Sequence, residues 1–345
     1  MYDRTSDELT TTLQSSQPTV FSDDTIEKIL ALTTSNTDTH VSISQTTVFA
    51  GGTVTIPSGT DLAYLTPISN QPITVSNAPV VVFNGLVGAN ATFNDGTSGG
   101  SDAGHVDRVI VGGAGSDKIV IADAKNTQVT IGNNDTVYAG SGADTVIATG
   151  GNSTIVGSTG GSTVVKLSGN ASDYTVTVDN GHAIVTGGTH NILVDNVHVI
   201  SGSSANDNLL IASNADQAAI MSLYQAALGH GADATTLAAA VSALSSGHAT
   251  LASLTTQIMA TAEYQTETSG MNDNDFVQML YQHTFGRAGE DAGVAYWTDA
   301  LTNHAANRAD LIRMFSEIGA HSRIGDLEHN EAQVIGSVTI VHNIV

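Results

Sequence analysis

Short runs in which apolar and polar residues alternate fill the chain from about residue 41 onward, and Gly, Asn and Pro interrupt them. Alternation with a period of two is typical of a half-buried β-strand, and the interrupting residues favour turns. We therefore expect a β-rich domain over residues 41–205. We expect residues 1–40 to form a polar N-terminal segment with one short helix, which Ser22 can cap and in which Ile26 and Ile29 share a face.

Between residues 107 and 166 the alternating runs become a repeat. Each unit starts with a polar residue, continues with alternating apolar residues and ends in a turn, and successive units start at nearly constant spacing. One unit buries too little apolar surface to fold alone, so the units must stack into a continuous core. This predicts a parallel β-solenoid or β-roll. The seven units begin at Asp107, Asp117, Thr127, Asp135, Asp144, Ser153 and Ser162.

The pattern becomes helical over residues 206–325, where Ala and Leu recur with helical spacing. This half is itself duplicated. The tripeptide Leu-Tyr-Gln at positions 223–225 recurs at positions 280–282, and at the same offset Gly229 corresponds to Gly286. We therefore expect two copies of a three-helix unit packed together.

The Gly-rich turns of the β repeat carry a specific pattern. Residues 112–120 fit the nonapeptide G-G-x-G-x-D-x-U-x at every fixed position, and residues 139–147 fit it with one Gly replaced by Ala. The segment resembles the calcium-binding β-rolls of the RTX family, and the resemblance implies Ca²⁺ as the cofactor. Glycines permit the tight turns, and aspartates supply the oxygen ligands that calcium prefers. The expected metal-site residues are Gly113, Gly115, Asp117, Asn133, Asp135, Gly140, Gly142 and Asp144.

The spacing of the aspartates limits how many ions can bind. In a roll with two strands per coil, every second turn stacks on the same edge, so Asp117 and Asp135, which begin alternate units, share an edge. Asp144 begins the unit directly after that of Asp135 and therefore falls on the opposite edge. We expect about one to three calcium ions rather than a full ladder. One alternative stays open, in which these aspartates only cap their turns and bind no metal.

The second helical copy carries a further resemblance. Aromatic residues at 276, 281 and 285 lead to a Gly-Arg pair at 286–287, and Tyr296-Trp297 follow. This looks like the DUF4214 family, a helical module of large secreted bacterial proteins that often stands beside RTX repeats. The first copy departs from the pattern, because Ala240 stands where the second has Trp297.

These patterns together predict an α+β multidomain chain, in which a β-solenoid or RTX-like β-roll precedes an all-α helical domain of two three-helix repeats. The expected divisions are 1–40, the polar segment with a short helix; 41–205, the β-rich domain with the roll at 107–166; 206–325, the helical domain duplicated at 215–264 and 272–320; and 326–345, a C-terminal strand or secretion tail.

Composition narrows the classes of partner. The 345-residue chain has 33 acidic and 10 basic residues, a formal charge of -23. Nucleic acid is not expected as a partner, because binding its phosphates requires clustered Lys and Arg. No apolar stretch approaches the length of a membrane span, and the first residues lack the cationic and apolar regions of a cleaved Sec signal. With no Cys, disulfides are excluded, so a fold locked outside the cell would need another device.

These observations predict a function without catalysis. We find no zinc-protease motif, nucleophile elbow or phosphate-binding loop, so we do not expect an enzyme. The family resemblances imply a bacterial protein exported without a cleaved N-terminal signal, which folds on calcium outside the cell. We expect it to self-assemble on the cell surface as an S-layer-like lattice or filament. The tail at 334–345 could add a strand to the next subunit, or could be a strand of its own domain or part of a secretion signal.

Two other functions stay open. One is a calcium-dependent adhesin or carbohydrate-binding protein that contacts cell-surface polysaccharide without self-assembly. The other, which the sequence favours less, is an enzyme acting on extracellular polysaccharide. Paired carboxylates can serve such an enzyme, but the basic residues that usually accompany them are absent between Lys166 and Arg287.

Overall fold

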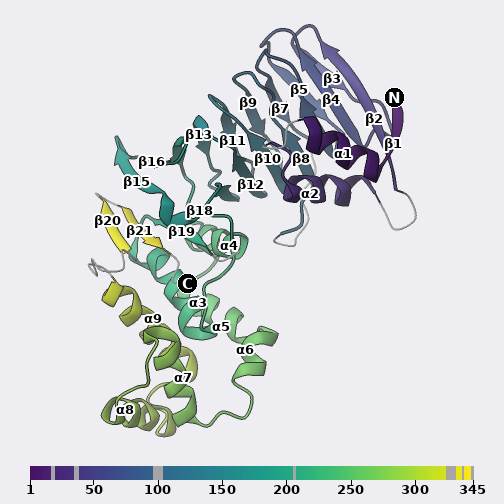
Figure 1. The fold of residues 1–345 in the computed structure, drawn as a ribbon. Coiled ribbons are helices and arrows are strands. Elements are labelled where there is room, and N and C mark those ends of the chain that lie inside the picture. The colour runs from purple at the N-terminus through teal and green to yellow at the C-terminus, as the bar shows by residue number, and fades with distance from the viewer. Residues whose placement is uncertain are drawn as a thin grey trace. The chain divides into compact units, whose positions relative to one another are not determined.

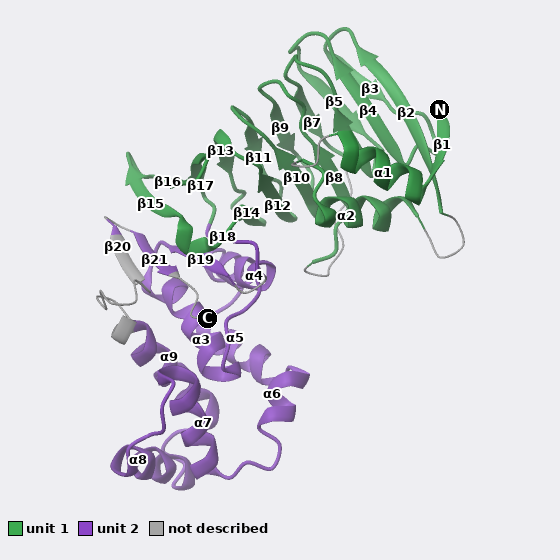
Figure 2. Cartoon of the chain, in the orientation of Figure 1, with its two compact units in different colours: residues 1–197 green, residues 198–345 purple. Residues whose placement is uncertain are grey.

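The computed structural model describes residues 1–16, 20–34, 39–95, 104–204, 207–323, 332–335 and 338–342. The chain forms two compact units, residues 1–197 and 198–345 (Figure 2). The chain is α+β: strands in mixed sheets dominate the first unit, and helices dominate the second (Figure 1).

The strands of the first unit alternate between two sheets as the chain proceeds. In spatial order, one sheet contains β1 (Tyr2–Thr5), β2 (His40–Val48), β4 (Leu62–Pro67), β6 (Val80–Phe83), β8 (Arg108–Val111), β10 (Thr127–Ile131), β12 (Ala143–Ala148) and β14 (Ser162–Lys166). The other sheet contains β15 (Thr175–Asp179), β16 (His182–Gly187), β17 (His190–Asp195), β13 (Gly151–Val156), β11 (Thr136–Tyr138), β9 (Lys118–Ile121), β7 (Asn90–Phe93), β5 (Ile73–Ser76) and β3 (Gly52–Thr55).

Most neighbouring strands are parallel, and between β2 and β14 neighbours in one sheet are two strands apart in the chain. Ile119 of β9 is opposite Val137 of β11, which is opposite Ile155 of β13, so both steps advance the chain by the same length. These three side chains are fully buried, and the residues on either side of each are more exposed, as the alternation of a half-buried strand predicts. All seven expected repeat units form strands, β8 to β14. Antiparallel pairing occurs only near the ends in the described part of this unit, for β1 with β2 and for β15, β16 and β17.

Two helices, not one, cover the N-terminal part of the first sheet. The expected helix is α2 (Asp23–Thr33), and the Ser22 side chain accepts a hydrogen bond from the Thr25 N–H as its N-cap. The additional helix is α1 (Ser6–Ser16), whose Leu9 and Leu13 are fully buried in a core shared with α2 and strands β2, β4, β6 and β8. Residues 1–40 are therefore not only a polar segment with one helix. Two buried leucines are enough to pack the mostly polar helix α1 against an apolar sheet face.

The second unit contains the helices that follow the β-rich segment. They are α3 (Ala215–Leu228), α4 (Ala234–Ser245), α5 (Leu251–Met259), α6 (Ala262–Glu267), α7 (Asp273–Phe285), α8 (Asp291–Thr302) and α9 (Arg308–Arg323). The starts of α4 and α5 recur as the starts of α8 and α9 at the offset that relates the two sequence copies. Gly229 and Gly286 end α3 and α7 in the same left-handed conformation, with φ of 75° and 65°. This conformation favours glycine, which explains why both copies keep it.

The C-terminal tail forms strands with its own chain. A hairpin of β20 (Ala332–Ile335) and β21 (Val338–His342) pairs with β19 (Asn208–Ala212), which pairs in turn with β18 (Val199–Ser201). These pairings place residues 198–212 in the compact unit of the helices. Part of the predicted tail, residues 326–331, 336–337 and 343–345, lies outside the described residues.

Candidate functional site

Two aspartates of the predicted metal site occupy successive turns on one edge of the first unit. The Asp117 carboxylate precedes β9 and accepts the N–H groups of Ala89 and Gly113, both at 2.6 Å. The Asp135 carboxylate precedes β11 and accepts the N–H groups of Asp117 and Gly132, both at 2.7 Å. Each carboxylate thus closes its own turn and ties it to the preceding turn of the same edge.

The third aspartate repeats this arrangement in the other sheet. Asp144 lies in β12, and its carboxylate accepts the N–H of Gly140 at 2.7 Å and that of Thr127 at 2.9 Å. Because β12 belongs to the sheet of β10 and β14, the structure brings Asp117 and Asp135 together and leaves Asp144 apart from them.

The other predicted site residues shape the same turns. Gly113 and Gly140 donate their N–H groups to the aspartates, and the Asn133 side chain accepts the N–H of Asn152 at 2.9 Å. Gly115 and Gly142 lie where successive turns touch. A Cβ at Gly142 would lie 2.6 Å from the Lys125 carbonyl oxygen, and one at Gly115 would collide with the backbone of Gly88. Glycine is therefore required at both positions by close approach.

Burial perturbs all three carboxyl groups. The exposed fractions of Asp117, Asp135 and Asp144 are 2%, 1% and 1%. Burial raises the pKa of Asp117, raises that of Asp135 to about 6 and raises that of Asp144 to about 7, against the opposing effect of the backbone N–H groups. Within the described parts of the chain, no Lys, Arg or His lies within ion-pair distance of these three carboxylates.

The fit to calcium depends on which oxygens remain available. A carboxylate offers about four lone-pair positions, and the two N–H groups at each aspartate occupy two of them. Calcium takes six to eight oxygens, and no cluster of three or more Asp, Glu or His is placed to hold a metal among the described residues. A calcium ion here would therefore draw most of its ligands from backbone carbonyls and water. The turn-capping alternative already accounts for the hydrogen bonds just described, and calcium stays a prediction.

The first unit also contains a buried ionic cluster that the sequence did not predict. The Arg108 side chain, 1% exposed, lies 2.6 Å from the Asp123 carboxylate and 3.1 Å from that of Asp95. Lys125 contacts the same Asp95 carboxylate at 2.6 Å. Burial works to raise the pKa of Asp95, but the hydrogen bond from Lys125 and the charge of Arg108 outweigh it and hold that pKa below its usual value.

The sequence carries no clear signal for this cluster. Lys118 occupies the position of Arg108 in the next repeat unit, yet it is exposed and lies over the ring of Tyr138. The two sets of carboxylates differ in their charge partners. Asp95 and Asp123 form ion pairs with basic residues of their own chain, whereas no described Lys, Arg or His lies within ion-pair distance of the three turn aspartates.

Comparisons with known proteins identify part of the second unit. Residues 255–318 match the family described as "Domain of unknown function (DUF4214)", a segment that extends from within α5 into α9. This confirms the DUF4214 resemblance and starts it at residue 255 rather than at the expected residue 272. Searches of curated proteins and of solved structures gave no match. Among the described residues, no helix combines the length and apolar character needed to cross a bilayer.

Proposed function

We propose that this chain is a secreted bacterial structural protein that folds on calcium and self-assembles on the cell surface as an S-layer-like lattice or filament. The observation that carries the proposal is the stacked pair of buried carboxylates, Asp117 and Asp135, without a basic partner in the described chain. A DUF4214 domain in the same chain supports the proposal, because this family often occurs in large secreted bacterial proteins.

The proposed architecture of the first unit is a parallel β-roll of the RTX type. Its support is the alternation of successive strands between two sheets, with an equal advance along the chain from Ile119 to Val137 and from Val137 to Ile155. In such a roll, turns of one edge stack directly, and a cation between stacked turns would join consecutive coils.

Calcium would act on folding through charge. Burying an ionised carboxylate without a partner is unfavourable, and a divalent cation near Asp117 and Asp135 would offset that cost. Because the ion would bind the folded turns and not the open chain, it would stabilise the fold by about 2.7 kcal/mol at a free concentration about 100 times its Kd. A chain exported unfolded would then fold only where calcium is abundant.

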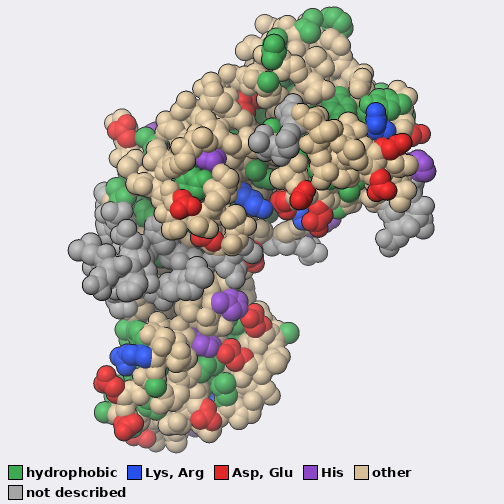
Figure 3. Space-filling view, in the orientation of Figure 1, with side chains coloured by type: hydrophobic (Ala, Val, Ile, Leu, Met, Phe, Trp, Pro, Cys, Tyr) green, Lys and Arg blue, Asp and Glu red, His purple; other side chains and the backbone are tan. Residues whose placement is uncertain are grey.

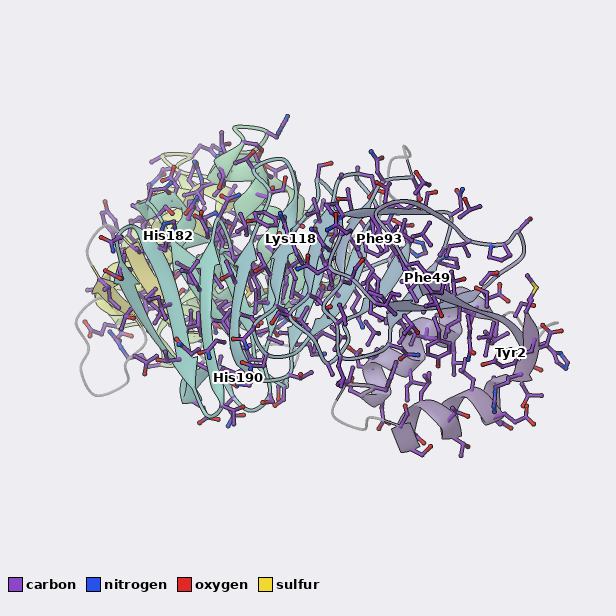
Figure 4. All side chains as sticks on the ribbon, turned by 90° about the horizontal axis from the view of Figure 1, so that it is seen from above. Tyr2, Phe49, Phe93, Lys118, His182 and His190 are labelled. Carbon is purple, nitrogen blue, oxygen red and sulfur yellow. The ribbon has the colours of Figure 1, made fainter. Side chains whose placement is uncertain are left out.

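Self-assembly would use strand edges and an apolar row beside one of them. β3 pairs only with β5, and β20 only with β21, in the described part of the chain, so each presents an edge to which another strand can be added. Phe49, Ile68 and Leu86 follow β2, β4 and β6 in successive turns and are 72%, 50% and 88% exposed. Phe49, labelled in Figure 4, lies shortly before the open strand β3. An apolar row beside an open edge favours contact with another copy.

The test combines metal dependence with assembly. Purified chain is refolded with and without millimolar calcium, analysed for bound metal, followed by circular dichroism and imaged by negative stain. We expect folding and ordered sheets or fibres only with calcium, and we expect Phe49→Ser to weaken assembly while Tyr296→Ser, a change at a similarly exposed aromatic in α8, leaves it intact. A chain that is monomeric in every condition would refute self-assembly. A circular dichroism spectrum unchanged by chelator, with no bound metal, would refute the calcium role.

A further inference from the structure

A cavity of about 310 Å³ lies in the first unit between α1 and strands β1, β2 and β4. Its apolar lining includes Leu9, Phe21 and Ile43, which belong to the core between the N-terminal helices and the sheet. Its polar lining includes Arg4, Gln45 and Asn84. A small cavity with an apolar wall and a few convergent polar groups has the composition of a site for one small ligand.

The Arg4 guanidinium is the cationic group of this cavity, and its charge is not neutralised by the described chain. Its Nη1 donates to the Thr12 hydroxyl at 3.2 Å, and its Cζ lies 5.9 Å from the centre of the Tyr2 ring. No carboxylate lies within ion-pair distance of it among the described residues. Every other arginine with a described side chain has such a carboxylate: Arg108, Arg287, Arg308 and Arg313.

This lack of a partner is unexpected from the charge of the chain. Acidic residues outnumber basic ones by 33 to 10, and Figure 3 shows more acidic than basic side chains on the face that it draws. In such an acidic chain, an arginine is expected to have a carboxylate nearby. Arg4 thus keeps most of its five N–H donors for a group from outside, and a carboxylate is the group whose geometry matches them.

Other polar groups of the cavity are also available. Gln45 donates through Nε2 to the Tyr2 hydroxyl at 3.2 Å, which leaves its carbonyl oxygen unused among the described contacts. The Tyr64 hydroxyl and the Asn84 side-chain amide have no hydrogen-bond partner within the described residues. Figure 4 shows Tyr2 on β1 beside the helices that cover this end of the sheet.

Tyr2, Tyr64 and Arg4 also interact electrostatically. Burial raises the pKa of Tyr64, Tyr2 raises it further, and Arg4 works in the opposite direction. The three side chains therefore lie close enough to act on one bound molecule, with one positive charge, hydroxyl and amide groups, and apolar ring faces.

We propose that this cavity binds a single acidic sugar ring, such as a uronic acid residue of an extracellular polysaccharide. Arg4 receives the ring carboxylate, Asn84 and Gln45 hydrogen-bond sugar hydroxyls, and the tyrosine rings contact the C–H face. The volume is at the lower end for ligand pockets, which favours one ring over an oligosaccharide. The proposal concerns a different surface from the calcium turns and does not depend on assembly.

The test is an NMR titration of the full chain, in the buffer in which it folds, with D-glucuronate, D-glucose and acetate. We expect glucuronate to bind at least about tenfold more tightly than glucose, because a charge-assisted hydrogen bond discriminates by that order. We also expect it to bind more tightly than acetate, which lacks the hydroxyls and the ring. Shift changes should centre on Tyr2, Arg4, Tyr64 and Asn84. A competition experiment with galacturonate polymer and free uronate then shows whether the cavity binds the terminal residue of a polysaccharide or only the free acid.

Variants separate the cavity from the rest of the chain. Arg4→Gln should remove the preference for glucuronate over glucose, whereas Arg287→Gln, the same change at an exposed arginine of the second unit, should leave it unchanged. Asn84→Ala should weaken both sugars. If Arg4→Gln fails to fold, the position of the shift changes in the wild type and the affinity of Asn84→Ala for both sugars test the proposal instead. Equal affinity for glucuronate and acetate, no binding at the highest soluble concentration, or shifts centred elsewhere would each overturn the proposal.

Discussion

The buried Asp135 carboxyl group gives the chain a specific dependence of stability on pH. Burial raises its pKa in the folded state to about 6, above the ordinary value of 3.8. Below pH 3.8 both states carry the proton, and above about pH 6 neither does. Between these values the folded state holds a proton that the unfolded chain has lost. The stabilisation from protonation is therefore complete at low pH and is lost as pH rises through about 6.

The size of this effect follows from the displacement of the pKa. Each pKa unit corresponds to about 1.4 kcal/mol, so a displacement of about two units corresponds to about 3 kcal/mol in total. Because the unfolded carboxyl group is already partly ionised at about pH 4, Asp135 alone makes the calcium-free protein about 2–2.5 kcal/mol less stable at about pH 7.5 than at about pH 4. Asp135→Asn removes this titration. It also places an amide nitrogen against one of the two N–H donors, Asp117 or Gly132, at a cost of about 1–3 kcal/mol that does not vary with pH.

Urea unfolding followed by circular dichroism, in chelator and at several pH values from about 4 to about 7.5, measures the effect. The difference in unfolding free energy between wild type and Asp135→Asn should change by about 2–2.5 kcal/mol across this range. Asp179→Asn, the same change at an exposed residue of β15, should give a constant difference. Parallel curves for wild type and Asp135→Asn would refute the reasoning. With saturating calcium the sign should reverse, because protonation would then displace the ion.

Two other perturbations address the packing of the first unit. Arg108→Leu should lower the unfolding free energy by about 3–5 kcal/mol, because it leaves a buried carboxylate unpaired, and the double variant with Asp123→Leu should recover part of the loss; urea titration of the four proteins measures the coupling. Gly142→Ala should destabilise by about 1–3 kcal/mol in thermal unfolding, whereas Gly160→Ala, whose Cβ would meet only ordinary contacts, should have little effect; equal melting temperatures for both would contradict the close approach of the turns.

Periodic features of the fold were predictable from the sequence. The seven repeat units give strands β8 to β14, because a period of two fixes which side chains face the core without reference to distant residues. The Ser22 cap and the duplicated helices, with glycines at residues 229 and 286, were likewise predictable from local rules. Helix α1 was missed, because its two core leucines stand among polar residues and gain their burial only from the sheet.

Sequence alone determined where the chain turns and which residues close the turns, since backbone conformation and spacing are local properties. Only the tertiary structure decided which charges meet. Arg108 and Lys118 hold the same place in neighbouring units, yet one is buried against two carboxylates and the other is exposed. The partner of β21 and the cavity around Arg4 were also decided at that level. The physical reason is that burial and charge pairing depend on segments far apart in the chain, whose meeting no local pattern records.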